Sequence, residues 1–321
     1  MKMKKLVRGV KNRLLRLSDK PHEFLLFNGV SHQKETFFKL QNSFSQAAKK
    51  LSEASLGDFV EPHWKDLNKT FLNVIKNGIP FSFLRHPLIG YTMFAQGRGE
   101  WMNNQITFLK SIFSIDVLKK VLREDFAVMP LIMQHSFKTS HNSIHLLYHI
   151  ARWQKTTNIN IYDINTVIEW GGGYGRFAVL FDRLRGDKPY TYIIIDTPLF
   201  SSLQGLYLSV ILGEEKVNFI DNEKGKIMDG KINIVPLNYV GVCGEVKADL
   251  FVSTWALSES SLFSQRFVIE KNMYEARHIL MAYQEKNIRL PNAEGVKDIV
   301  QKFGCVIEDI SFLPPNHYIF K

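Results

Sequence analysis

The residues best suited to chemistry form a glycine-rich segment with an acid in front of it. Residues 167–176 read Val-Ile-Glu-Trp-Gly-Gly-Gly-Tyr-Gly-Arg, so Glu169 stands two positions before the first glycine. The glycines of this segment are Gly171, Gly172, Gly173 and Gly175. The apolar residues before it predict a buried strand, and a helix is expected directly after it. Glycines in such a turn let the backbone approach a ligand without a Cβ in the way.

The spacing of this segment discriminates between two classes of cofactor. A dinucleotide fingerprint is G-x-G-x-x-G, with the pyrophosphate at the helix N-terminus. Gly171 and Gly173 fit that pattern, but Arg176 stands where the last small residue is expected. The carboxylate of Glu169 would repel a pyrophosphate, whereas it suits S-adenosylmethionine (SAM), which carries positive ammonium and sulfonium groups and no phosphate. We therefore expect SAM as the cofactor and S-adenosylhomocysteine (SAH) as its product.

Polar residues near the ends of other strands are expected to complete the cofactor site. Asp196 ends a predicted strand at a point where an acid can accept hydrogen bonds from both ribose hydroxyls. An alternative role for Asp196 is to cap the helix that begins near Pro198. The further candidates are Thr197, Ser253 and Thr254, and Arg98 and Arg176 as partners of the cofactor's carboxylate. Either arginine could instead be a solvated surface side chain.

Three histidines and one glutamate are candidates for the base that methyl transfer to a hydroxyl would need. His141, His145 and His149 lie four residues apart in a helix predicted to start after Ser140, so they share one face. The base is then His141 or His145, at the end facing the crevice. A zinc-binding histidine pair and plain packing against the sheet are the alternatives. Glu259 is the second candidate base, or else an acid in the first turn of a helix. No metal ligands are assigned, and a metal requirement stays open.

The elements that must position these residues change character near residue 158. Before it, apolar residues recur at helical spacing, which predicts a helical N-terminal cap over residues 1–157. After it, short apolar runs alternate with helical stretches, which predicts an α/β domain over residues 158–321. The expected strands are 166–169, 192–196, 233–237, 249–253 and 279–283, and the expected helices are 174–184, 199–212, 261–276 and 292–303. The last two runs, 305–313 and 317–320, have no helix between them and predict an antiparallel pair at the edge of a Rossmann-like parallel sheet.

Composition and charge narrow the class of protein. The chain has 321 residues, of which 45% are hydrophobic and 22% are charged, within the ordinary globular range. Its only cysteines are Cys243 and Cys305, and its apolar runs are shorter than the ~20 residues that span a bilayer. No secretory signal is recognisable at the start of the sequence. We therefore expect a cytoplasmic protein.

The net charge of +10 comes mainly from one end of the chain. Residues 1–20 hold eight lysines and arginines and one aspartate, interleaved with leucines and valines. The rest of the chain is close to balanced, which argues against a nucleic-acid-binding fold. The tail is either an amphipathic helix on an anionic membrane surface or a frayed, solvated terminus. The sequence leaves both interpretations open.

Three motifs resemble a known family. They are the glycine segment 167–175, the Ile-Asp-Thr-Pro of residues 195–198 and the Asp-Leu-Phe-Val-Ser-Thr-Trp-Ala-Leu-Ser-Glu of residues 249–259. With the stretches 123–125 and 138–145, this pattern resembles the sugar O-methyltransferases of bacterial polysaccharide gene clusters, within the class I SAM-dependent methyltransferases. The resemblance covers about residues 80–321.

The resemblance implies a Rossmann-like catalytic domain with a helical cap that transfers a methyl group to a hydroxyl of a sugar or glycan precursor. Two rival functions remain. One is a nicotinamide-dependent sugar oxidoreductase, against which Glu169 and Arg176 argue. The other is a non-catalytic scaffold at a membrane surface, favoured by the basic tail and by the absence of one unambiguous base.

Overall fold

The fold is known from a computed structural model that describes residues 30–321 apart from 54–55, 76, 95–98, 126–127 and 286–295. The basic tail of residues 1–20 and the candidate ligand Arg98 therefore lie outside the described residues. Among the described helices, none combines the length and apolarity that crossing a bilayer requires.

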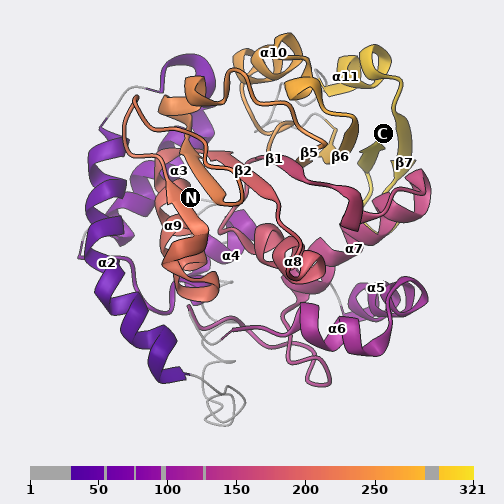
Figure 1. The fold of residues 1–321 in the computed structure, drawn as a ribbon, viewed down its shortest axis with the longest axis horizontal. Coiled ribbons are helices and arrows are strands. Elements are labelled where there is room, and N and C mark those ends of the chain that lie inside the picture. The colour runs from indigo at the N-terminus through magenta and orange to yellow at the C-terminus, as the bar shows by residue number, and fades with distance from the viewer. Residues whose placement is uncertain (1–29, 54–55, 76, 95–98, 126–127, 286–295) are drawn as a thin grey trace, which may run out of the picture.

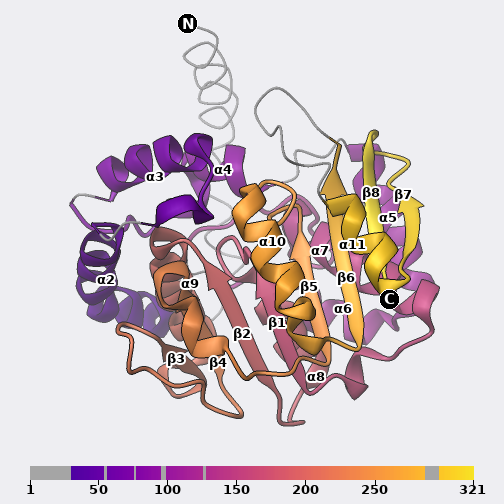
Figure 2. The same ribbon diagram turned by 90° about the horizontal axis from the view of Figure 1, so that it is seen from above.

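One sheet of eight strands runs through the described part of the molecule (Figure 2). Its order is β3-β4-β2-β1-β5-β6-β8-β7. The strands are β1 (Thr166–Trp170), β2 (Thr191–Asp196), β3 (Val217–Phe219), β4 (Ile232–Pro236), β5 (Leu250–Thr254), β6 (His278–Gln284), β7 (Val306–Asp309) and β8 (Asn316–Phe320). The first six are parallel, while β8 pairs antiparallel with both β6 and β7. The predicted fold class, a parallel sheet with an antiparallel C-terminal strand pair and a helical N-terminal region, is confirmed.

Helices cover both faces of the sheet, with α10 and α11 on one side and α7, α8 and α9 on the other (Figure 1). Tyr192 and Ile194 of β2 face the α7–α9 side, and Ile193 and Ile195 face the other, as the alternation of a strand requires. The bounds are α7 (His141–Thr157), α8 (Arg176–Arg185), α9 (Pro198–Leu212), α10 (Leu262–Glu270) and α11 (Val296–Phe303). Short 3-10 helices lie at Ile161–Asp163, Glu214–Lys216, Leu237–Cys243 and Asn272–Glu275.

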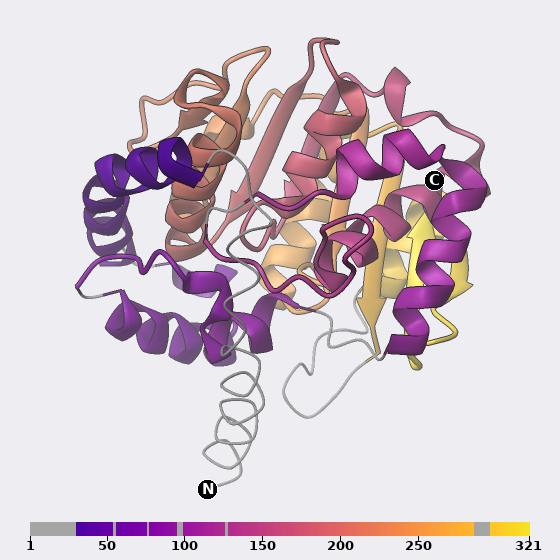
Figure 3. The ribbon, with the colours of Figure 1, turned by 90° about the horizontal axis from the view of Figure 1, so that it is seen from below.

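The N-terminal helices are α2 (Val30–Ser52), α3 (Pro62–Val74), α4 (Pro87–Met93), α5 (Gly99–Ile112) and α6 (Ile115–Leu122), with 3-10 turns at Gly57–Phe59 and Phe83–Arg85. Of these helices, α2 packs on α9, α5 on α7 and α6 on α8, whereas α3 and α4 lie beyond the ends of the strands (Figure 3). One apolar core holds residues from both predicted regions, such as Phe37 and Phe71 with Phe177 and Leu203. This core contains residues from both sides of the predicted domain boundary at 157/158. The boundary itself stays a prediction.

Two details of the sheet region differ from the sequence expectation. The helix predicted over 261–276 ends at Glu270, because four successive residues from Asn272 to Glu275 take positive φ angles of 52° to 56°, which no right-handed helix can include. Strand β3 is absent from the expected elements, since it has only three residues and none of them is fully buried. It pairs with β4 at the edge of the sheet.

The contact between α2 and α9 depends on a small residue. A Cβ on Gly205 would overlap the ring of Phe44, so the two helices approach closely there. We expect Gly205→Val to lower the free energy of unfolding by ~1–3 kcal/mol through overpacking. Thermal denaturation measures this loss. Gly241→Ala is the control, because nothing lies within 4 Å of its added Cβ. Equal melting temperatures for both variants would contradict the described packing.

Candidate functional site

A cavity of about 320 Å³ lies at the carboxyl ends of β1, β2 and β5. In a sheet of this type the ligand site is the crevice where the connections from neighbouring strands run in opposite directions. Here α8 leads from β1 to β2 on one side, and β5 flanks β1 on the other. Helix α3 and the end of α4, which lie beyond these strand ends in Figure 2, close the cavity with Trp64, Met93 and Phe94. The volume falls within the range of small-molecule sites.

The predicted glycine segment forms one wall of this cavity and needs its glycines. Gly171 has a φ of 79°, and a Cβ on it would overlap Ala256. A Cβ on Gly172 would lie 2.6 Å from Ile194 Cγ2 and 3.1 Å from Glu169 Oε2. Gly175 has a φ of 94° and caps α8. The segment is therefore a close-packed turn between β1 and α8, as the sequence predicted, with the carboxylate of Glu169 directly behind it.

Two acids of the predicted cofactor set lie together under this turn. The pKa of Glu169 is raised to about 8, mainly by burial and to a smaller degree by the charge of Asp196, against the lowering effect of a 2.9 Å hydrogen bond from the Tyr192 hydroxyl. Burial also raises the pKa of Asp196 to about 7, although the backbone N–H of Thr197 donates to it at 2.7 Å. A positive group in the cavity would favour the charged form of both carboxyls. The site is suited to a cation.

Gln204 hydrogen-bonds to this acid pair and was not among the site residues predicted from the sequence. Its Nε2 donates to Asp196 Oδ2 at 2.8 Å and to the Gly173 carbonyl at 2.9 Å, and the residue is fully buried. It therefore joins the glycine turn to the second acid. A signal was present, because Gln204 is a polar residue of high hydrogen-bonding capacity within the apolar helix α9.

The other predicted cofactor residues divide into two groups. Thr197 and Thr254 line the cavity, and the hydroxyl of Thr197 is buried with no hydrogen-bond partner among the described residues. Ser253 is not among the lining residues: it donates to the Trp170 carbonyl at 3.0 Å and accepts the N–H of Leu257 at 3.0 Å. The hydroxyl of Ser253 therefore stabilises the turn after β5 through these two hydrogen bonds.

Of the predicted histidines, the structure brings only His145 to the cavity wall. Its Nδ1 lies 2.8 Å from Gln105 Nε2, and its Nε2 is buried without a partner among the described residues. Burial first, and the neighbouring His149 and His141 next, lower its pKa well below 6.5. His141 starts α7 and does not line the cavity, while His149 Nδ1 bonds the Tyr318 hydroxyl at 2.8 Å. In the described residues no cluster of three or more metal-binding side chains occurs.

Glu259 lies on the cavity wall and is not the first-turn acid that the sequence left as an alternative. Helix α10 begins only at Leu262, capped by Ser261, so Glu259 precedes the helix. Burial raises the pKa of Glu259 to about 7, and Gln284 Nε2 donates to it at 3.2 Å. Trp255, whose carbonyl accepts the Glu259 N–H, has a φ of 67° and stacks on His145. A non-glycine residue held in that conformation is typical of a functional site.

Arg176, which was predicted as a partner of the cofactor's carboxylate, is among the residues that line the cavity, but its donors are directed to protein groups. Its guanidinium donates through Nε to Ser143 Oγ and through its other nitrogens to Asp125, Tyr207 and the carbonyls of Leu122 and Arg123. It also pairs with Glu124 at 3.3 Å, and its side chain is fully buried. All of its donors are therefore engaged by the protein, and we do not retain it as a partner for a cofactor carboxylate.

The raised pKa of Glu169 makes stability depend on pH. The folded state holds this proton up to about pH 8, whereas the unfolded chain releases it near 4.5. The stabilisation is therefore complete below pH 4.5 and is lost as pH rises towards 8, at no more than about 1.4 kcal/mol per pH unit. We expect the melting temperature of the ligand-free protein to fall less steeply between pH 5 and 8 in Glu169→Gln than in the wild type. The exposed Glu223→Gln is the control. Parallel curves for Glu169→Gln and the wild type would show that Glu169 is ionised throughout.

No family model matches the chain, and no curated protein matches its sequence. Among solved structures it is similar to PigF with SAH, at 11% identity and a TM-score of 0.38 over 91% of this chain and 97% of that one. It is also similar to CalS11, a TDP-rhamnose 3'-O-methyltransferase of calicheamicin biosynthesis, at 14% identity and a TM-score of 0.36 over 70% and 96% of the two chains. The 16S rRNA methylase ArmA gives 11% and 0.35 over 70% and 98%.

Proposed function

We propose that this protein is a SAM-dependent O-methyltransferase that acts on a hydroxyl of a sugar or glycan precursor. The observation that carries the proposal is the acid pair behind the glycine turn at the carboxyl ends of β1 and β2, in which Glu169 is buried and Asp196 is partly exposed on the cavity wall. Both pKa values lie far above the usual range for carboxyls. A ligand that brings positive charge would lower them and would attract the ionised carboxylates.

The residues present fit SAM. Nothing lies within 4 Å of the position that a Cβ on Gly173 would take, so a ligand could lie against the backbone of the turn there. Asp196, held by Gln204 and the Thr197 N–H, would accept hydrogen bonds from the ribose hydroxyls. Glu169 would favour the cationic end of the cofactor, and the Thr197 hydroxyl would gain a partner. When bound, SAM supplies an electrophilic methyl group on its sulfonium.

The same features weigh against a dinucleotide. A pyrophosphate beside the turn would meet two acids, Glu169 and Asp196. Arg176, which also lines the cavity, donates its hydrogen bonds to residues of the cap and to Tyr207. The rival function of a nicotinamide-dependent oxidoreductase is thus less compatible with this site.

Glu259 is the better candidate for the base among the residues that line the cavity. General bases work best with a pKa near the operating pH, and that of Glu259 is about 7. His145 has a pKa well below 6.5, so it is a weak proton acceptor at neutral pH. Because Gln105 Nε2 donates to Nδ1, the neutral ring carries its proton on Nε2, which can donate a hydrogen bond to the acceptor oxygen and so orient it. Trp64, Phe94 and Trp255 line the same cavity, and aromatic faces of this kind suit the apolar face of a sugar ring.

The acid pair predicts the cofactor preference. Calorimetry should show SAM and SAH binding in the micromolar range and no binding of NAD. In Asp196→Ala the affinity for SAM should fall about 10²-fold, since two hydrogen bonds to a charged group are lost. The exposed Asp229→Ala is the matched control. Because ionised acids favour the cation, affinity should also rise from pH 6 to pH 8. Binding of NAD in place of SAM would overturn the proposal.

The raised pKa of Glu259 predicts its effect on turnover. Glu259→Gln should reduce kcat about 10²–10⁴-fold and leave SAM affinity unchanged, because the lost group acts on the acceptor proton. The wild-type rate should rise with pH through about 7, and this limb should disappear in the variant. The assay follows transfer of a labelled methyl group from SAM to a panel of free and nucleotide-linked sugars, with Glu223→Gln as the control. SAM binding without transfer to any sugar would favour the scaffold function instead.

A further inference from the structure

A buried charge links the glycine turn to the cap. The guanidinium of Arg176, in the first turn of α8, has no exposed side-chain surface and pairs with Glu124 at 3.3 Å. Burial alone would lower the pKa of Arg176, but the charge of Glu124 and of neighbouring groups raises it above its ordinary value. Seven residues further along the same helix, Arg183 binds Asp125 at 2.5 Å and the Val121 carbonyl at 3.2 Å. Two arginines on one face of α8 thus hold the segment 121–125.

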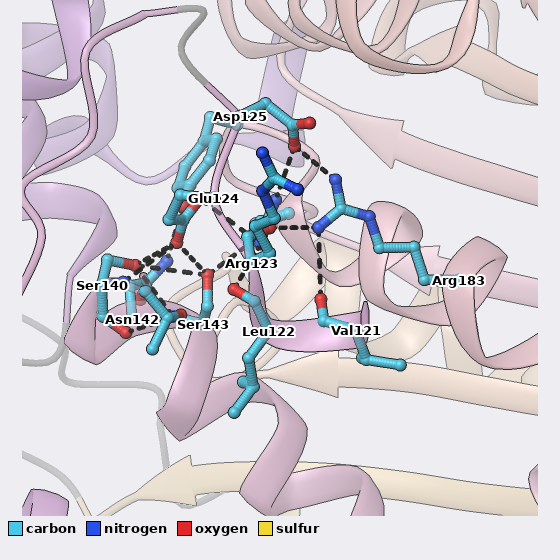
Figure 4. A network of polar contacts seen from close by, with 12 residues as sticks. Val121, Leu122, Arg123, Glu124, Asp125, Ser140, Asn142, Ser143 and Arg183 are labelled. Carbon is cyan, nitrogen blue, oxygen red and sulfur yellow. Dashed lines mark hydrogen bonds and ion pairs between the residues drawn. The ribbon is translucent and has the colours of Figure 1, made fainter. Parts of the chain in front are cut away.

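The carboxylate of Glu124 in turn holds the start of α7, as Figure 4 shows with Ser140 and Ser143 on one side of it. Glu124 Oε1 accepts the Ser140 N–H at 3.3 Å and the Ser140 hydroxyl at 2.5 Å, and it also accepts the Ser143 hydroxyl. Arg176 Nε donates to the same Ser143 Oγ at 2.7 Å. We call Glu124, Ser143 and Arg176 the buried triad. It connects α8 directly to the first turn of α7.

A second link runs parallel to the triad. Asn142 Nδ2 donates to the hydroxyl of Tyr174 at 3.2 Å, and both residues line the cavity. Tyr174 stands within the glycine turn, two positions before Arg176. The turn is therefore tied to α7 on both sides of Gly175. Asn142 and His145 are three residues apart on α7 and share one face, which is the face that reaches the cavity.

Burying an ion pair at this position has a large desolvation cost. Taking both charges out of water costs several kcal/mol for each, and apolar side chains of similar volume often stabilise a protein as well or better. A directional network has another property: it admits one orientation of α7 against the turn, because each donor has a defined acceptor.

We propose that Arg176 is a positioning residue, which acts through Glu124 and Ser143 to set Asn142 and His145 of α7 at the correct distance from the cofactor turn. The effect on turnover rests on the proposed function, whereas the effect on the start of α7 does not. A displacement of α7 by about 1 Å would suffice to cost ~10²-fold in rate.

The test is the double variant Glu124→Gln/Arg176→Met in the full chain. The introduced glutamine amide keeps an acceptor for the serine hydroxyls, and the introduced methionine replaces the arginine stem, so no lone buried charge remains. We expect SAM affinity within about threefold of the wild type, hydrogen exchange at least ~10-fold faster over residues 141–146, and kcat lower by ~10²-fold with little change in the KM for SAM. Ser143→Ala, which removes only the bridging hydroxyl, should show the same pattern to a smaller degree.

Arg185→Met is the matched control. Arg185 is also a buried arginine of α8, but it bonds Asn165 and the Pro189 carbonyl at the other end of the helix. It should lose stability while keeping wild-type exchange at residues 141–146 and wild-type turnover. Wild-type exchange and turnover in both Ser143→Ala and the double variant would overturn the positioning role. If the wild type itself fails to bind SAM, the proposed function fails, and the exchange measurement still decides whether the triad sets α7.

Discussion

The interaction on which most of the site depends is the burial of charge at the junction of the glycine turn and the cap. Arg176 is removed from water, and its desolvation is offset by Glu124, Asp125, two carbonyls and two hydroxyls from residues far apart in the sequence. Because a guanidinium has donors in fixed directions, these partners must converge with defined geometry. The cap and the sheet are therefore held in one arrangement by hydrogen bonds as well as by apolar packing.

Across the turn, the opposite situation holds for the acids. Glu169 is buried and Asp196 is partly exposed on the cavity wall, and both accept hydrogen bonds without a described cation beside them, which agrees with their raised pKa values. A protein interior tolerates such a pair only when something else is gained. The same turn thus has a buried cation with anionic partners on the side of the cap and two acids without a cationic partner on the side of the cavity. This asymmetry distinguishes Arg176, whose charge is already paired, from the two acids, whose charges are not.

The sequence predicted the sheet well and the site in part, for physical reasons. Buried parallel strands are short apolar runs, and the run ending at Asp196 is recognisable without knowledge of its neighbours. The end of α10 is not, since the residue types of Asn272–Glu275 do not show that these four residues take left-handed conformations before β6. Glu169 and Asp196 can be identified because a strand end places them, whereas Gln204 depends on how α9 packs. The partners of Arg176 could not be predicted, because nothing in its spacing shows that Glu124, 52 positions earlier, would reach it.

The core shared by the N-terminal helices and the sheet has a consequence for how such a protein can change. Helix α2 packs on α9 at Gly205, where any side chain would overlap Phe44. The facing surfaces of the two helices are therefore complementary in shape. A chimera that exchanged the N-terminal helices for those of a related chain would also have to exchange the matching surface of α9. Substitutions that change which ligands fit the cavity are then easiest at Trp64, Met93 and Phe94. These residues line the cavity and do not form the contact between Gly205 and Phe44.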